Sequence, residues 1–574
     1  MGEARQADGR ESRLGAAMRV LDPRGTLTRT ALRLAPRPAL AALATGPVLV
    51  YDNTKMDVGD YGVLLPRLKA GLAQRGVSRY VDHRETIRGK TAADIRALAQ
   101  QFKATGAVAA VIALADMGVS PAMVTLAIEL EKAGLPTVCL TGGPGNALAR
   151  AHAYYQAGAL PLVPLDLYAG STGAELTAQL DAALPRLWRL LTAHGDELAA
   201  LARVEYGLED PPTAADGALD LGDDEAAIYA ALDGWHIGDG LPVIAPTPPR
   251  YEAMRDFCVD DPDSVLFEGI GPSGAPLRVR DALVAAVMAG CAPAHAPLVL
   301  TALRAMAQPA YNLLQAVTTS FGGGHFVLVS GPLAAEAGMT GGAGCLGPGY
   351  RANATIGRAV NLALLNVCRN VPGHADLACL SSPAEFGYCM TEERALAPWP
   401  LIHEERYDAA TTCVMVLKAE APHCVLDLRS TRAEPLLETI VACCTTLGSN
   451  NAYVAGPLVV LLNPDHARLL TAGGYDKTRL RETIHREAGL ATRDLASRGL
   501  VGIGADGEGR RRVTRSPHDV EIVVAGGPGG HSAVILPWGL YSDAVFEVVR
   551  RADGEPARTL VELRRVSLDA RHVL

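Results

Sequence analysis

Short apolar runs and amphipathic stretches alternate along the first third of the chain. The apolar runs have the length and polar endings of buried strands, and the longer stretches carry apolar residues on one face of a helix. The strands are predicted at 47–53, 107–113 and 136–140, and the helices at 61–75, 95–105 and 122–133. Strands that alternate with helices predict a doubly wound parallel sheet.

Composition divides the chain into further segments. Residues 1–45 are rich in Arg, Ala and Pro, which predicts an extended arm whose first residues, about 15 of them, are disordered. Residues 205–230 are rich in Asp, Pro and Gly, which is typical of a linker. We therefore expect an α/β protein with a flavodoxin-like domain at 46–204 and a larger α/β unit after the linker.

The larger unit contains a pattern that occurs twice. Residues 312–333 and 436–462 each run from a helix, through a Thr-Thr pair and a polar or glycine turn, to an apolar strand with Gly-Pro-Leu. This parallel predicts two related lobes. The predicted lobes are 231–430 and 431–574. If they face each other, Thr319 and Thr446 lie around a shared cleft and are candidate substrate-binding residues.

The stretch 326–358 combines a strand, a glycine-rich loop and the start of a helix. The glycines let backbone N–H groups approach a ligand, and a helix N-terminus favours a negative charge. The candidate substrate-binding residues here are Arg351, Asn353 and Thr355, with Arg351 acting as a bidentate fork for a small anion. A purely structural glycine turn would have the same spacing.

Bulk composition limits the classes of partner. The chain has 574 residues, of which 49% are apolar and 20% charged, with a net charge of −9. These values are typical of a globular protein, and the lack of a basic stripe argues against nucleic acid. No apolar run reaches the roughly 18 residues that span a membrane. We expect a cytoplasmic homo-oligomer that binds a small-molecule substrate.

Eleven cysteines are scattered along the chain without a CxxC motif or zinc-ligand spacing. This pattern favours reduced thiols and leaves both a metal and a cofactor unassigned. Two cysteines lie at predicted turns, where a thiol could act as a nucleophile. They are Cys291, after an apolar helix, and Cys345, in the glycine-rich loop; burial as ordinary core residues is the alternative.

Polar residues follow each predicted strand of the first domain. Ligands of doubly wound sheets bind beyond the carboxyl ends of the strands, so these side chains predict one convergent polar site. The candidate binding residues are Asp52, Asn53, Asp116 and Ser120.

The same segments resemble a known family. DNTK at 52–55 and LADMGVSPAMVTLAIELEKAGLPTV at 114–138 resemble the UGSC family, which is named for a selenocysteine- or cysteine-Gly-Ser-Cys motif. The resemblance covers about 20–195 and implies redox or nucleophilic chemistry at the motif. Here Met117 takes the selenocysteine position and Ser120 the final cysteine position. We therefore expect the domain to bind a ligand or support an interface without running thiol redox chemistry.

The second half resembles another family. DGWHIGDGLPVIAPTPPRYEAM at 233–254 and AGGPGGHSAVILPWG at 525–539 are similar to a largely uncharacterised family that is often found beside UGSC proteins. The resemblance covers roughly 230–545 and implies a fusion of two proteins that share a site.

The second half also carries the acid–base candidates. His531 and Ser532 follow a glycine loop at a strand end, where an imidazole can reach a ligand. Glu392 lies in an acidic pair on a loop and is a candidate general base. A capping role for His531 and a solvated position for Glu392 are the structural alternatives.

These residues predict an enzyme that acts on a small anionic metabolite. We expect thiol, sulfur or carbon–heteroatom chemistry, in a site of the C-terminal half that the first domain completes. One alternative is an acid–base lyase or isomerase that uses His531 and Glu392 with inert cysteines. The other is a non-catalytic ligand-binding or scaffold protein.

Overall fold

The apolar runs of the first third form the middle of a five-stranded parallel sheet in the computed structural model. The sheet contains β2 (Val48–Asp52), β3 (Tyr80–Arg84), β4 (Ala109–Asp116), β5 (Thr137–Gly142) and β6 (Leu162–Leu165), in the order β3-β2-β4-β5-β6. Counted within the domain this is the order 2-1-3-4-5 of flavodoxin-like sheets. The predicted doubly wound domain is confirmed.

The structure describes most of the chain. The described residues are 18–27, 31–168, 170–208, 210–211, 213, 217–222, 224–376, 378–498, 504–539 and 542–565. The first 15 residues, which we expect to be disordered, lie outside them. None of the helices in this described part is both long and apolar enough to cross a membrane.

Helices cover both faces of the parallel sheet, so the central strands β2, β4 and β5 are buried along their whole length. One face packs against α2 (Leu64–Ala73) and α6 (Gly173–Thr192). The other face packs against α3 (Ala92–Ala104), α4 (Ser120–Lys132) and α5 (Gly145–Gln156). Capping boxes at Thr91 and Thr172 satisfy the first N–H groups of α3 and α6. We call this part the sheet domain.

The C-terminal half is built on two four-stranded sheets, and we call it the double-sheet unit. The first sheet contains β11 (Cys389–Thr391), β10 (Gly324–Ser330), β12 (Cys413–Ala419) and β19 (Val545–Val548), in that order. The second contains β13 (His423–Leu426), β18 (His531–Ile535), β14 (Leu458–Leu462) and β17 (Val520–Val524). Apolar side chains of both sheets, among them Leu328, Met415 and Leu461, form one core between them.

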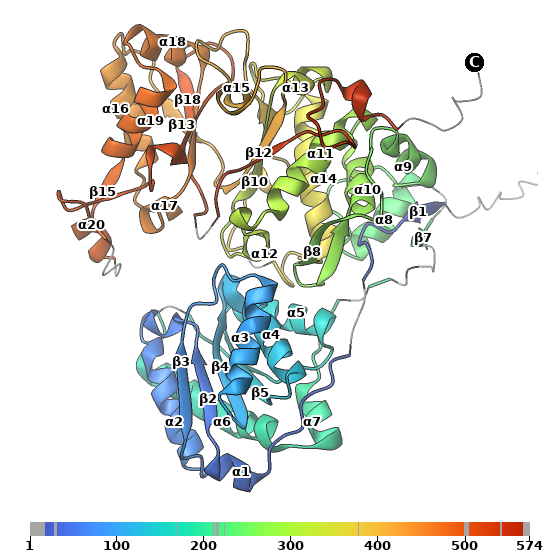
Figure 1. The fold of residues 1–574 in the computed structure, drawn as a ribbon, viewed down its shortest axis with the longest axis vertical. Coiled ribbons are helices and arrows are strands. Elements are labelled where there is room, and N and C mark those ends of the chain that lie inside the picture. The colour runs from blue at the N-terminus through green and yellow to red at the C-terminus, as the bar shows by residue number, and fades with distance from the viewer. Residues whose placement is uncertain are drawn as a thin grey trace, which may run out of the picture.

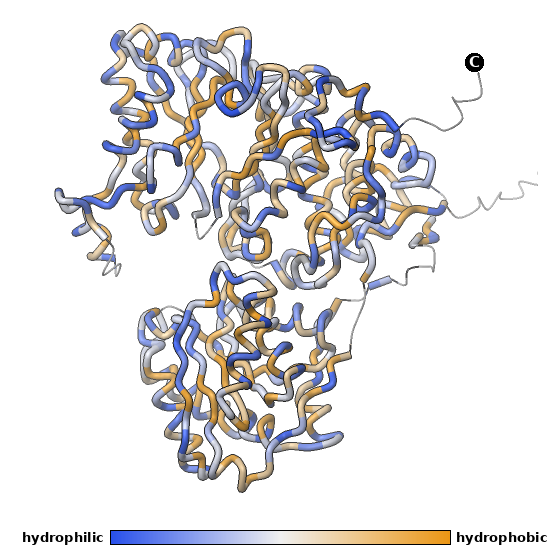
Figure 2. Tube along the Cα trace, viewed as in Figure 1, coloured by the Kyte–Doolittle hydropathy of each residue, from blue (hydrophilic) through white to orange (hydrophobic). Residues whose placement is uncertain are grey.

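Helices cover the outer face of each sheet and complete four layers, α/β/β/α (Figure 1). The first sheet packs against α10 (Val279–Ala289), α11 (Ala296–Ala307) and α14 (Arg351–Cys368). The second packs against α16 (Ala433–Cys444), α18 (Pro464–Ala472) and α19 (Lys477–Glu487). Figure 2 shows the apolar residues concentrated along the strands and the helix sides that meet them.

The two sheets share one pattern of strand pairing. In each, the first strand of the repeat runs parallel to the second and antiparallel to the third: β10 with β11 and β12, and β14 with β17 and β18. The fourth strands are exchanged, because β13 follows β12 in the chain but pairs with β18, and β19 follows β18 but pairs with β12. The two sheets thus share a pairing pattern, and the exchanged strands interlock them. The two segments that the predicted repeat aligns differ, however, because Gly331-Pro332-Leu333 follows β10 whereas Gly456-Pro457-Leu458 leads into β14.

Part of the predicted arm and linker is built into the double-sheet unit. β1 (Arg19–Leu21) pairs with β7 (Ala218–Asp220), and Val20 is buried in the core beneath α10 and α11. Arg24 is buried beside Asp22, with Nη2 and Oδ2 2.6 Å apart. The helix α8 (Glu225–Gly234) begins inside the predicted linker. Two chain segments therefore run between the sheet domain and the double-sheet unit.

Candidate active site

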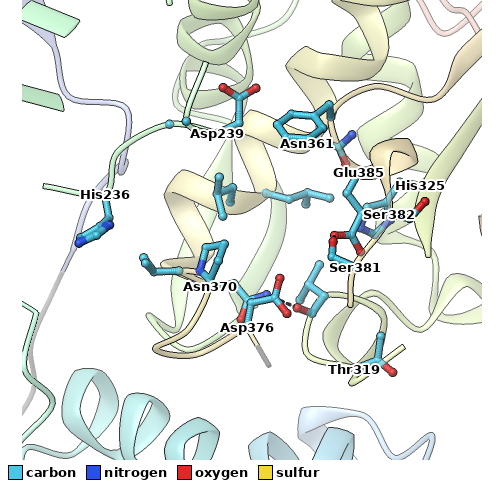
Figure 3. Close-up of a pocket in the computed structure, with 18 of the residues that line it drawn as sticks. His236, Asp239, Thr319, His325, Asn361, Asn370, Asp376, Ser381, Ser382 and Glu385 are labelled. Carbon is cyan, nitrogen blue, oxygen red and sulfur yellow. Dashed lines mark hydrogen bonds between the residues drawn. The ribbon is translucent and has the colours of Figure 1, made fainter. Parts of the chain in front are cut away.

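A cavity of about 370 Å³ lies at one end of the first sheet of the double-sheet unit. Its walls come from α14, from α12 (Leu313–Ala316) and from loops that include residues 236–240 and 370–386. Figure 3 shows Glu385, Ser381, Ser382 and His325 together on one side of this cavity, with His236 on the opposite side. Volume, apolar walls and a few converging polar groups are the usual properties of a small-molecule site.

Strand alternation explains how two ionisable side chains reach this cavity. On β10 and β12 the residues that face the helical layer are mostly valines, such as Val327 opposite Val416. At the end of this apolar stripe the pair becomes His325 opposite Lys418. Both side chains line the cavity. The sheet therefore holds an imidazole and an amine side by side on a rigid support.

Lys418 is the most unusual ionisable group of the site. It is 4% exposed, and its Nζ lies 3.9 Å from Oε1 of Glu385. Burial lowers the pKa of the Lys418 amine, although Glu385 and Asp376 oppose this shift. Burial also raises the pKa values of Asp376 and Glu385. Burial thus shifts the pKa of the amine and the pKa values of the two carboxyl groups toward each other, as in many acid–base sites.

His325 is held by a second buried polar group. Its Nδ1 shares a hydrogen bond of 2.5 Å with Oη of Tyr311, which belongs to the turn η5 (Pro309–Tyr311). Burial and the charge of Lys418 hold the pKa of His325 well below its ordinary value. The imidazole is therefore neutral at physiological pH, and the bond to Tyr311 fixes its orientation.

Two asparagines present free hydrogen-bonding atoms at the cavity. Nδ2 of Asn361 and Oδ1 of Asn370 are buried and have no hydrogen-bond partner among the described residues. An unpaired buried polar atom is costly, so these two residues of the cavity lining are candidates for ligand contacts that small side-chain rotations would complete. No group of three His, Cys, Asp or Glu side chains in the described part of the chain has the geometry of a metal site.

The sheet domain meets the rim of the cavity. Its turn η3 (Met117–Val119) follows β4 and lies against α12. Oγ of Ser320 donates a hydrogen bond of 3.7 Å to Sδ of Met117. A methyl group added at Gly118 would lie 3.7 Å from Cα of Thr319, which itself lines the cavity on the side of the sheet domain (Figure 3). Among the candidate substrate-binding residues named above, Thr319 lines this cavity.

The structure places the other candidates of the double-sheet unit elsewhere. His531 is exposed at the start of β18, with Nδ1 3.5 Å from Sγ of Cys424. Ser532 is buried, and its Oγ lies 2.7 Å from Nδ1 of His466. Thr446 is exposed and donates to the carbonyl of Cys443 at 3.4 Å. None of these side chains lines the cavity.

Glu392 forms a separate buried group with Ser330 and His403. Ser330 donates to Oε2 of Glu392, and Oγ of Ser330 lies 2.9 Å from Nδ1 of His403. The backbone N–H of Ile402 donates to Glu392 at 3.0 Å. Burial raises the pKa of Glu392. The group lies at the opposite ends of β10 and β11 from the cavity, and Glu392 and His531 are not brought together.

The two candidate cysteines are buried thiols. Sγ of Cys291 donates to the carbonyl of Thr355 at 3.3 Å, and burial raises the pKa of Cys291 to about 12. Burial also raises the pKa of Cys345. Since the thiolate is the reactive form, both cysteines are poor nucleophiles in this state of the protein.

The glycine-rich loop uses its polar side chains internally. Nε of Arg351 donates to the carbonyl of Gly290 at 2.9 Å, at the C-terminal end of α10. Nδ2 of Asn353 donates to the carbonyls of Thr340 at 2.9 Å and Cys345 at 2.8 Å. Thr355 donates to the carbonyl of Arg351 at 2.8 Å. These bonds hold the loop and occupy the amide of Asn353, whereas the exposed Arg351 uses only part of its N–H donors in them.

The candidates of the sheet domain do converge at the carboxyl ends of its strands. Nζ of Lys55 lies 3.5 Å from Oδ2 of Asp116. Asn53 bridges to β4, because its Nδ2 donates to the carbonyl of Leu114 at 2.9 Å. Asp52 accepts from the backbone N–H of Thr54 at 2.8 Å. Ser120 is fully buried, and its Oγ has no hydrogen-bond partner among the described residues.

Sequence reasoning missed Lys418, His325, Asp376 and Glu385. A signal for the first two was present, because each is the one His, Lys, Arg, Asp or Glu residue within a mostly apolar strand, GHFVLVS or CVMVLKA. Asp376 and Glu385 lie on a loop and carry no local pattern. Only the tertiary structure brings them to Lys418.

Comparison with known proteins agrees with the resemblance of the first domain. Residues 19–167 match the model of the UGSC family, so the sheet domain is UGSC-like. Neither the curated proteins nor the solved structures contain a match to the chain. The fold and the site therefore define an α/β protein in which a UGSC-like domain lies at the rim of a cavity in a double-sheet unit.

Proposed function

We propose that the chain is an enzyme that transfers protons on a small polar metabolite bound in the cavity of the double-sheet unit. The observation that carries the proposal is the buried Lys418 amine, which lies 3.9 Å from Glu385 at a cavity of about 370 Å³. An amine and a carboxyl group with pKa values shifted toward each other can act as a base and an acid at the same pH. Lyase and isomerase reactions use such a pair.

The thiols give less support to sulfur chemistry. Among the described cysteines, Cys291 and Cys345 have raised pKa values, and neither lines the cavity. The internal hydrogen bonds of Arg351 and Asn353 likewise weaken the expectation of an anion site in the glycine-rich loop. The acid–base alternative is therefore favoured, with Lys418 and Glu385 in place of His531 and Glu392.

The role of the sheet domain in this proposal is to complete the rim of the cavity. In the resemblance to the UGSC motif, Met117 takes the selenocysteine position and Ser120 the cysteine position, and neither carries a selenol or a thiol. The contacts of Met117 with Ser320 and of Gly118 with Thr319 support this role. A fusion of two proteins with one shared site would have this arrangement.

The test is an isotope-exchange screen that needs no knowledge of the substrate. Wild-type protein is incubated with mixtures of small metabolites in D₂O, and mass spectrometry detects compounds that gain deuterium or change mass. The proposal predicts at least one such compound, and loss of the effect in Lys418→Met. Lys477→Met is the matched control, since Lys477 is 5% exposed in the other lobe and does not line the cavity.

Two results would overturn the proposal. One is exchange that persists in a folded Lys418→Met variant. The other is a metabolite that raises the melting temperature of the protein without any exchange or turnover, which would indicate a binding protein.

A further inference from the structure

We propose that Lys418 forms an imine with the carbonyl carbon of its substrate, so that the enzyme acts on small aldehydes or ketones. This inference rests on the proposed function and assigns a substrate class to the same cavity. It requires an amine that a ligand can reach, a nearby proton donor and room for the carbonyl compound.

The position of Lys418 satisfies the first requirement. Its side chain leaves the middle layer of the unit from β12, opposite His325, and its amine reaches the cavity. Within the described residues we find no hydrogen bond from Nζ, and its ion-pair contact with Glu385 is long, at 3.9 Å. A lysine held by short ion pairs stays charged and cannot attack a carbonyl group, whereas the long contact of Lys418 and the lowered pKa of its amine favour the neutral, nucleophilic form.

The neighbouring carboxyl groups satisfy the second requirement. Glu385 lies beside Nζ, and Ser381 donates a hydrogen bond to the other carboxyl oxygen of Glu385, which orients it. Asp376 lines the same wall. Burial raises the pKa of both carboxyl groups, so each can hold a proton until the reaction needs it.

The chemical step balances with these groups alone. The Nζ lone pair attacks the carbonyl carbon, and one N–H proton passes to the carbonyl oxygen through Glu385, which gives a carbinolamine. The hydroxyl group then leaves as water with a proton from the Glu385 carboxyl group, and the nitrogen lone pair forms the C=N bond. The products are a protonated imine, one water and a Glu385 carboxylate that neutralises the new charge. No oxidant or reductant is involved.

The remaining polar groups indicate what else the substrate carries. Asn361 offers an unpaired N–H donor and Asn370 an unpaired acceptor. Apolar residues, such as Leu364 and Phe386, line the space between the polar groups. A short oxo compound with a second polar group, such as a hydroxyl or carboxyl group, would satisfy both asparagines.

Reductive trapping tests the imine directly. The wild-type protein is incubated with pyruvate, glyoxylate, 2-oxobutyrate or glycolaldehyde in the presence of cyanoborohydride, and peptide mapping locates each adduct. We expect at least one probe to label Lys418 at least ten-fold faster than Lys69, a half-buried lysine that is paired with Asp82 in the sheet domain, and Lys418→Arg to lose this adduct. Glu385→Gln should slow the labelling about ten-fold in a protein that remains folded by circular dichroism.

The outcomes separate this inference from the proposed function. If no probe labels Lys418 faster than Lys69, the imine is excluded for this class of substrate. Deuterium exchange that depends on Lys418 would then leave the acid–base enzyme standing. Absence of both trapping and exchange would overturn the two proposals together. Equal labelling of Lys418 in native and urea-unfolded protein would contradict the inference, because the folded site would then contribute nothing.

Discussion

The two sheets of the double-sheet unit have the same strand pairing but different residues at one position. The strands β10 and β14 correspond to each other in the two sheets. The residue five positions before the last residue of the strand is His325 for β10 and Pro457 for β14. Lys418 lies across from His325, and the same register continued from β14 to β18 places Pro537 across from Pro457. One lobe therefore carries an imidazole and an amine where the other carries two prolines.

This difference shows how chemistry can be added to a repeated fold without changing its core. The apolar residues between the sheets are buried equally in both lobes, as Leu328 and Leu461 show. His325 and Lys418 lie at the end of the row of apolar pairs on β10 and β12, where they take the place of one further apolar pair. The second lobe supports the first through the exchanged strand β19, which pairs with residues Cys413 to Val416 of β12, the strand that carries Lys418.

The largest expected effect is on turnover. Lys418→Met removes the base, and we expect the rate to fall about 10²–10⁴-fold, the usual contribution of a positioned acid or base. Lys477→Met in the second lobe should retain the rate within about three-fold once its folding has been confirmed. Initial rates on the metabolite found by isotope exchange measure both. An equal loss in the two variants would remove the distinction between the lobes.

Substitutions in the core between the sheets should lower the free energy of unfolding by similar amounts in the two lobes. Leu328→Ala and Leu461→Ala each leave a cavity in the shared core between the sheets, and each should lower the free energy of unfolding by about 2–5 kcal/mol. Urea midpoints of the variants measure this effect. A large loss for Leu328→Ala with none for Leu461→Ala would show that the lobes fold as separate units.

The two histidines sharpen the comparison further. His325→Ala should lower the rate about ten-fold or more, because His325 lines the cavity and is fixed by Tyr311. His531→Ala should leave the rate within about two-fold, since His531 is exposed and outside the cavity. Steady-state kinetics of the two variants measure these losses. A larger loss of rate in His531→Ala than in His325→Ala would indicate that the active site lies at His531.

The pH dependence of the rate should be bell-shaped. Lys418 must lose its proton, so the rate rises as pH climbs through the lowered pKa of Lys418. A carboxyl group must keep its proton, so the rate falls as pH climbs through the raised pKa of Glu385 or Asp376. Glu385→Gln should remove or shift one limb of the bell and leave the other in place. A flat profile from pH 5 to 9 would be inconsistent with this pair.

The smallest expected effect concerns thiols. Iodoacetamide should label the exposed Cys379 and Cys424 much faster than the buried Cys291 and Cys345. Cys291→Ser and Cys345→Ser should keep the rate within about three-fold. Peptide mapping with parallel rate measurements tests this expectation. Inactivation that follows labelling of Cys291 or Cys345 would favour thiol chemistry instead.

The fold of the first domain could be predicted from the sequence because buried strands and amphipathic helices each leave a recognisable pattern of apolar residues. Strands buried on both faces, such as β2 and β4, appear in the sequence as continuous apolar runs. The exchange of β13 and β19 could not be predicted, since it depends on which sheet edge each strand reaches after it leaves its own repeat.

The candidate site was harder to predict because its parts are distant in sequence. His325 and Lys418 become neighbours only when β10 and β12 pair, and Glu385 joins them from a loop. Arg351 and Asn353 carry the residue types of an anion site, yet carbonyl groups of the protein take their hydrogen bonds. Sequence pattern does not distinguish a side chain that binds a ligand from one that holds a loop.

The most direct test of the account is a crystal structure of the protein with the metabolite that exchanges deuterium. The account predicts ligand density in the cavity of the first lobe, within hydrogen-bonding distance of Asn361 or Asn370 and in contact with Nζ of Lys418. Ligand bound instead beside His531, or at Lys55 and Asp116 of the sheet domain with the cavity empty, would contradict it.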